Sequence, residues 1–114
     1  MKYAFLGYAL PGALDGLTLV ERAAWEADLA AFHAELGQRA CVVHGAPLAE
    51  SDTATTVRMD NGQASVVDGP FNGAGDLQAV LVIDVPDLDV ALDLAKRSPA
   101  ARIGSVEVRP LRPM

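Results

Sequence analysis

Apolar and polar residues alternate with a period of two in several segments of this chain, which is typical of strands. The first such segment covers residues 2–9, and the last, "SVEVRPL", covers residues 105–111. Residues 39–47, "RACVVHGAP", form a third strand-like segment. Residues 77–85, "LQAVLVIDV", are apolar almost throughout, which indicates a central strand buried on both faces of a sheet.

Two other segments place apolar residues three and four positions apart, which predicts amphipathic helices. The first begins with a capping box formed by Thr18 and Glu21, and we expect Gly37 to end it. Its apolar stripe consists of Trp25, Leu29, Phe32 and Leu36. The second helix opens after residues 86–87, "PD", and closes before Pro99.

Asn61 and Gly62 stand between two β-rich segments and form the strongest local signal in the chain. Both residues tolerate the positive φ angles that a two-residue turn requires, so the pair predicts a β-hairpin. Its second strand ends at Asp68, where "VVDGPF" interrupts the apolar run.

The order of these elements is strand, helix, strand, hairpin, strand, helix, strand. This order predicts an α+β fold, the ferredoxin-like split βαβ arrangement with an inserted β-hairpin, as a single domain over residues 1–114. Two helices cover only one face of such a sheet. We therefore expect the other face to pack on a second copy, giving a homodimer.

Composition narrows the classes of partner. The 114 residues carry a net charge of −6, which disfavours nucleic acid and anionic membranes as partners. Cys41 is the one cysteine, and it is expected to be a buried, unreactive thiol in the apolar "ACVV". An unpaired thiol fits a reducing cytoplasm, and residues 3–6 read as a buried strand more readily than as part of a signal peptide.

Five short segments stand out together: "ATTVR" (54–58), "DGPF" (68–71), "VIDV" (82–85), "DLDVAL" (87–92) and "PAARIGSVEVRP" (99–110). In this order and spacing they resemble the DGPF family within the YCII-related proteins, over essentially the whole chain. The resemblance implies a dimeric α+β barrel and a bacterial protein of unassigned activity. Relatives often appear beside alternative sigma factors, and a His–Asp pair has been proposed as catalytic in YCII-like proteins.

The chain also departs from the pattern that it resembles. Residues 72–76, "NGAGD", replace the Glu-Lys-Glu cluster usual after the motif, and residues 79–81, "AVL", replace Gly-Tyr-Tyr. The helix histidine of YCII-like proteins has no match, and Ser98 stands where they have Asp. The catalytic pair of those proteins therefore does not transfer to this chain.

Asp68 and His44 are the candidate catalytic residues when the sequence is considered without the resemblance. Asp68 reads first as a turn residue that caps backbone amides, and second as a desolvated base beside Phe71. His44 shares a predicted strand face with Val42 and is either a core residue or an acid–base group facing a cavity. His33 is expected on the surface of the first helix or at a dimer edge.

Arg58 is a candidate clamp for a ligand anion, or it pairs with a carboxylate of the protein such as Asp68 or Asp60. The same two readings apply to Arg109. The remaining candidate substrate contacts are Gly69, Pro70, Phe71 and Tyr8. Close ligand spacings and a phosphate-binding glycine loop are both missing from the sequence, so no metal and no cofactor are expected.

Two functions stay open on this basis. In the first, a cytoplasmic homodimer binds a small organic molecule between sheet and helices, with cofactor-free acid–base chemistry at Asp68 and His44. In the second, a protein of the same fold binds a ligand or regulates transcription without catalysis. A dimer that only serves as a structural partner of a transcription regulator is a third reading.

Overall fold

The computed structural model describes residues 1–71 and 76–113. The described part is a mixed α+β structure with antiparallel sheets and three α-helices. Its strands are β1 (Lys2–Ala9), β2 (Cys41–Pro47), β3 (Thr55–Asp60), β4 (Gln63–Asp68), β5 (Asp76–Asp84) and β6 (Gly104–Pro110). Its helices are α1 (Leu19–Arg39), α2 (Leu88–Arg97), α3 (Ala100–Ile103) and the short 3-10 helix η1 (Ser51–Thr53).

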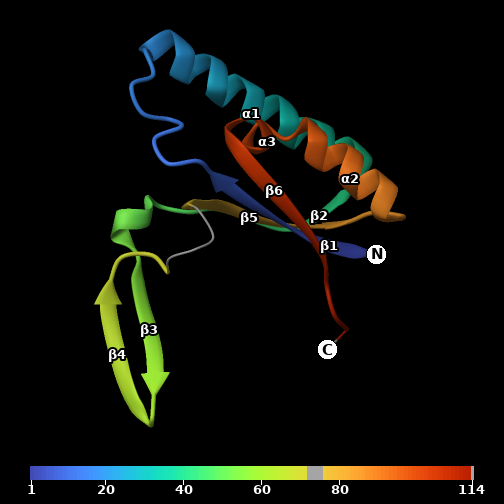
Figure 1. The fold of residues 1–114 in the computed structure, drawn as a ribbon. Helices are drawn as coiled ribbons and strands as arrows, with labels where there is room; N and C mark the ends of the chain where they lie inside the picture. Colours follow the sequence, from blue (N-terminus) through green and yellow to red (C-terminus); the bar gives the residue numbers. More distant parts are fainter. Residues whose placement is uncertain (72–75, 114) are drawn as a thin grey trace.

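The four-stranded sheet has the order β2-β5-β1-β6, and every neighbouring pair is antiparallel. This arrangement is compatible with a ferredoxin-like fold and puts β5 in the interior of the sheet, as its apolar sequence predicts. The α-helices lie on one face of the sheet (Figure 1). Of the helices in the described residues, none combines the length and apolar character needed to cross a membrane.

The hydrophobic core lies between this helix-covered face and the helices. It consists of Tyr3, Phe5, Phe32, Leu36, Ile83, Val85, Ala91, Leu94 and Ala95. Within the predicted stripe of α1, Phe32 and Leu36 are buried, whereas Trp25 and Leu29 are only half-buried. The stripe therefore reaches the core at its C-terminal end alone.

The start of α1 is confirmed and its end is not where the sequence suggests. Thr18 Oγ1 accepts a hydrogen bond from the backbone N–H of Glu21, and the Glu21 carboxylate accepts from the N–H of Thr18. Gly37 does not stop the helix, which continues to Arg39. A glycine inside a helix costs about 1 kcal/mol, and the packing of the fully buried Leu36 offsets that cost.

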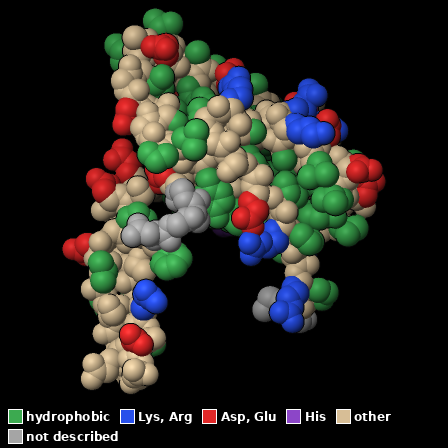
Figure 2. Space-filling model, in the orientation of Figure 1, with side chains coloured by type: hydrophobic (Ala, Val, Ile, Leu, Met, Phe, Trp, Pro, Cys, Tyr) green, Lys and Arg blue, Asp and Glu red, His purple; other side chains and the backbone are tan. Residues whose placement is uncertain are grey.

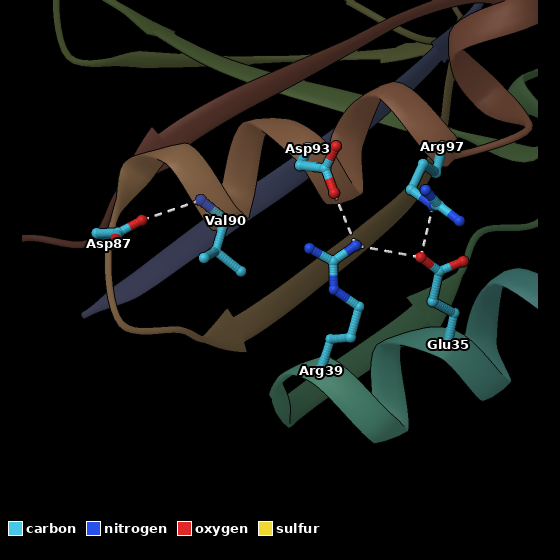
Figure 3. Close-up of polar contacts among 6 residues, drawn as sticks. All are labelled: Glu35, Arg39, Asp87, Val90, Asp93 and Arg97. Carbon is cyan, nitrogen blue, oxygen red and sulfur yellow. Dashed lines mark hydrogen bonds and ion pairs between the residues drawn. The ribbon is translucent and has the colours of Figure 1, made fainter.

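Ion pairs hold α1 against α2. The Arg39 guanidinium donates to Asp93 at 2.7 Å and to Glu35 at 3.2 Å, and Glu35 also accepts from Arg97 (Figure 3). Arg39 holds the pKa of the Asp93 carboxyl below its usual value through this hydrogen bond. Asp87 caps α2 by accepting from the N–H of Val90 at 3.0 Å, which confirms the predicted helix start.

The hairpin β3–β4 is confirmed and forms a separate two-stranded sheet. Asn61 and Gly62 occupy its turn with φ angles of 49° and 79°, as the Asn-Gly signature predicts. The hairpin projects away from the body, on the side of the sheet opposite the helices (Figure 1). We call residues 55–68 the arm.

The face of the four-stranded sheet that no described helix covers is called the open face. Its centre carries Ala4, Leu6 and Val82, which are half-buried. Within one copy, the expectation that the β5 strand is buried on both faces is therefore wrong. Cys41 pairs with Asp84 on this open face and is exposed, so the expected burial of its thiol is wrong for the same reason.

Candidate functional site

A cavity of about 590 Å³ lies between α1 and one end of the sheet. It is lined from β1, α1, β2, β5 and the segment around α3. The lining residues are Phe5, Gly7, Tyr8, Ala9, Leu14, Trp25, Leu29, Phe32, His33, Val42, Gly45, Ala46, Pro47, Leu48, Gln78, Ala79, Val80, Leu81, Ser98, Ala100, Ile103 and Val106. The core thus gives way to open space beneath the N-terminal part of α1.

Small residues at the sheet explain why this space is not filled. Gly7 pairs with Ala79, which pairs in turn with Pro47, and all three line the cavity. Gly45 also lines the cavity, but there the Cδ1 atom of Leu81 lies 3.1 Å from the position that a Cβ would take, so that position is already occupied. In a close-packed interior a run of such small side chains facing a helix leaves a void.

Trp25 forms part of the cavity wall. The Arg102 guanidinium carbon lies 5.9 Å from the centroid of the Trp25 ring, and Arg102 also donates to Asp28 at 2.9 Å. Arg102 therefore contacts the indole of a residue that also lines the cavity. Trp25 reads from the sequence as a core residue, yet it is only half-buried because the cavity occupies the space beneath it.

His33 also lines the cavity, which the sequence did not indicate. Its ring centroid lies 5.9 Å from that of Phe32, at an angle of 42° between the ring planes. The imidazole is exposed to solvent, so it lies at the rim of the cavity. It provides both a hydrogen-bond donor and an acceptor at the entrance.

Few polar side chains join His33. The others are Tyr8, Gln78 and Ser98, and no Asp, Glu, Lys or Arg of the described residues lines the cavity. Ser98 is buried, and its Oγ accepts from the N–H of Ala100 at 3.3 Å. Gln78 donates to Asp76 at 2.8 Å. The cavity is therefore apolar, with a few uncharged polar groups suited to orienting a ligand.

His44 lies on the opposite side of the sheet from this cavity. Strand β2 bulges between Val42 and His44, so that Val42 pairs with Ile83 and His44 pairs with the neighbouring Val82. Val42 accordingly lies on the helix side and lines the cavity, while His44 is exposed on the open face. The prediction that the two residues share a face is wrong, because one extra residue in a strand reverses the alternation.

Asp68 ends β4 at the base of the arm and is exposed. The turn after it is held by other groups: the N–H of Gly69 donates to the Ala54 carbonyl at 2.7 Å, and Thr56 Oγ1 donates to the Gly69 carbonyl at 2.8 Å. Gly69 has a φ of 111°, which favours glycine there. The Asp68 carboxylate makes no hydrogen bond to another described residue.

The other predicted contacts are spread over the molecule. Arg58 lies on the arm and is exposed, as is Phe71, with 68% of its surface accessible. Arg109 pairs with Glu107 at the edge of the open face. Of the predicted site residues, only Tyr8 lines the cavity; Asp68, His44, Arg58, Gly69, Pro70 and Phe71 do not. Acid–base chemistry at Asp68 and His44 stays a prediction.

One signal in the sequence does point to the cavity. The small residues Gly7, Gly45, Ala46 and Ala79 fall in the same end of three neighbouring strands. Together with the strand order, these positions indicate the part of the sheet where large side chains are missing and a cavity can form. Among residues 1–71 and 76–113, no three His, Cys, Asp or Glu side chains gather as a metal site would require.

Comparison with known protein families identifies one match. The model of the YCII-related domain matches residues 1–114, the whole chain. No curated protein matches.

Proposed function

The chain belongs to the YCII-related family, and on that premise we propose that it binds a small, uncharged, largely apolar organic molecule in the cavity beneath α1. The cavity volume of about 590 Å³ carries this proposal, because ligand sites commonly measure about 300–1,000 Å³. The cavity is partly open to solvent, so a ligand can enter it and displace water from an apolar lining, which is favourable.

The chemistry of the lining selects the ligand class. A charged group that enters an apolar cavity without a partner loses its hydration, which is strongly unfavourable. No charged side chain among the described residues lines the cavity to compensate. The ligand therefore has an apolar body and one hydroxyl or carbonyl group, which meets His33, Tyr8 or Gln78.

The same geometry favours binding without catalysis as the primary activity. Asp68 and His44, the predicted acid–base residues, are both outside the cavity lining. His33 and Tyr8 are its only titratable side chains among the described residues. Binding of a neutral molecule needs no more than this set provides.

The protein acts as a homodimer in this proposal, with the open faces of two copies packed together as a dimeric α+β barrel. The half-buried apolar centre formed by Ala4, Leu6 and Val82 supports this arrangement, because a sheet face of this kind is normally covered. His44 and Arg109 flank this centre on the two edge strands. Both would then lie near the dimer interface.

Three probes with the same apolar chain test the ligand class: octan-1-ol, octanoate and octylammonium. Trp25 is the only tryptophan of the chain and borders the cavity, so its fluorescence reports occupancy. Octan-1-ol is expected to bind at least about 10-fold more tightly than octylammonium, which is about 1.4 kcal/mol. Equal binding of all three, or a preference for the cation, contradicts the proposal.

A filled cavity provides the control. Ala79→Phe places a large side chain in the space, whereas Ala27→Phe makes the same change at an exposed position of α1 outside the lining. Octan-1-ol binding is expected to be lost in the first variant and retained in the second. Circular dichroism establishes that both variants are folded.

A further inference from the structure

We infer that the arm is a clasp that packs its apolar face on a second copy of this chain. This inference rests on the dimer of the proposed function and goes beyond it, because packing of the open faces does not by itself require the arm. Four features support it: the two-sided chemistry of the arm, its isolation, the surface area of the chain and the direction in which the arm projects.

Over residues 57–66 the arm has one apolar and one polar face. The pairing register places Val57 opposite Val66 and Met59 opposite Ala64, and these pairs share a face. Val57, Met59 and Val66 are 63%, 67% and 65% exposed. The other face carries Arg58 opposite Ser65 and Asp60 opposite Gln63. At the base of the arm this division ends, because Val67 lies on the polar side and Asp68 on the apolar side. Such alternation is typical of a sheet with one covered face.

None of the described residues covers this apolar face, since Val57, Met59 and Val66 are all exposed. The arm stands away from the body, with hydrophobic side chains at its surface (Figure 2). A two-stranded hairpin alone is at best marginally stable in water and needs a surface to pack against. The described residues of one copy do not supply that surface, so the exposed apolar side chains of the arm favour packing on a partner.

The dimensions of the chain show how large that partner surface is. The accessible surface is 7980 Å², whereas a compact monomer of 11.9 kDa exposes about 5900 Å². The radius of gyration is 16.0 Å, against roughly 13 Å for a compact chain of this length. The excess of about 2000 Å² per copy falls in the range buried by obligate homodimers.

A second copy of the chain fits better than an unrelated protein. The open face and the arm project to the same side of the molecule (Figure 1). A two-fold arrangement buries both surfaces at once, because the copy that covers one open face also meets the arm beside it. Each copy then holds the other with its own arm.

Val66→Asp tests the clasp, with Ser65→Asp as the matched control. The two residues are neighbours in β4, but Val66 is on the apolar face and Ser65 on the polar face. Sedimentation velocity across a concentration series gives the dimer dissociation constant of each protein. An unpaired carboxylate in an apolar interface is expected to raise that constant about 100-fold or more in Val66→Asp, and Ser65→Asp is expected to leave it unchanged.

Each other outcome has a clear consequence. If wild type is a dimer and Val66→Asp dimerises equally well, the clasp is wrong while the dimer of the proposed function stands. If wild type is a monomer at all concentrations, both are wrong, and ligand binding by the cavity is judged separately with the octyl probes. If both variants dissociate, the effect belongs to charge and not to the apolar face, and the clasp is again wrong.

Hydrogen exchange tests the same point without a substitution. Backbone amides within the β3–β4 ladder are expected to become more protected as protein concentration rises through the dimer dissociation constant, since clasped arms open less often. Exchange that is fast in the arm at every concentration would overturn the clasp, even if the protein proves to be dimeric.

Discussion

Val42 and His44 lie on opposite faces of β2, although only one residue separates them. Regular alternation would place both on the same side. The bulge between them points Val42 toward the cavity beneath α1 and leaves His44 on the open face. This single irregularity separates the histidine that the sequence favours from the cavity, and it leaves His33 as the one histidine that lines it.

The two histidines are therefore expected to differ in their effect on ligand binding. His33→Ala should weaken octan-1-ol binding roughly 5-fold, because it removes a hydrogen-bond partner worth about 1 kcal/mol at the rim of the cavity. His44→Ala should leave that binding unchanged. Titration followed by Trp25 fluorescence measures both. If His44→Ala lost binding and His33→Ala did not, the binding site would lie on the open face and not in the cavity.

The turn after Asp68 offers a second test. Thr56→Val removes the hydrogen bond from Thr56 Oγ1 to the Gly69 carbonyl and is expected to lower the free energy of unfolding by about 1 kcal/mol. Asp68→Asn is expected to change it by less than about 0.5 kcal/mol. Thr56→Ser, which keeps the hydroxyl, is the control. If Asp68→Asn proved the more damaging change in thermal unfolding, Asp68 would be the main support of the turn.

The backbone of β1 leaves no room for a side chain at Gly104, the first residue of β6. A Cβ at this position would come within 1.9 Å of the Tyr8 carbonyl oxygen, which is backbone and does not move aside easily. Gly104→Ala is therefore expected to destabilise the protein by about 1–3 kcal/mol.

Gly37→Ala is its control, because nothing lies within 4 Å of the Cβ position at residue 37 and the residue is inside α1. It is expected to stabilise by about 0.5–1 kcal/mol. Urea unfolding measures both variants. Equal effects of the two substitutions would contradict the close approach of Gly104 to Tyr8.

Acid should weaken the link between α1 and α2. The hydrogen bond from Arg39 lowers the pKa of Asp93 in the folded protein relative to the ordinary value of 3.8. The stability that this pairing contributes is complete above the unfolded pKa and is lost as pH falls through the folded pKa. Both side chains are open to solvent, with 36% and 49% of their surface accessible, so the effect is small.

Asp93→Asn is expected to flatten the fall of Tm below about pH 5. Glu26→Gln, a change at an exposed residue elsewhere on α1, serves as the control and is expected to leave the profile as in wild type. Identical acid profiles for wild type and Asp93→Asn would show that the ion pair contributes nothing measurable.

Local rules in the sequence predicted much of the fold. The capping box at Thr18, the cap at Asp87 and the Asn61-Gly62 turn each depend on a few neighbouring residues, and each is present in the structure. The order of elements predicted an α+β fold of the ferredoxin-like kind, and the observed sheet is compatible with it. The prediction that α1 ends at Gly37 was wrong, because the preference of glycine for helix ends is weak and tertiary packing overrides it.

The site was harder to predict because it depends on what is missing between elements. The cavity arises where small residues of three strands face α1, and no single segment shows it. The bulge in β2 moves His44 to the other face of the sheet. The sequence does not indicate this bulge, since residue 43 is valine and not glycine or proline. Trp25 looked like core because helical spacing does not reveal where a helix extends beyond its support.

Intermolecular NOEs between octan-1-ol and the protein provide the most direct test of the cavity as the binding site. The account predicts cross-peaks from the octyl chain to Trp25 and Leu29, which line the cavity. The other exposed apolar surfaces act as internal controls. Cross-peaks confined to Met59 and Val66 of the arm, or to Leu6 and Val82 of the open face, would contradict the proposed function.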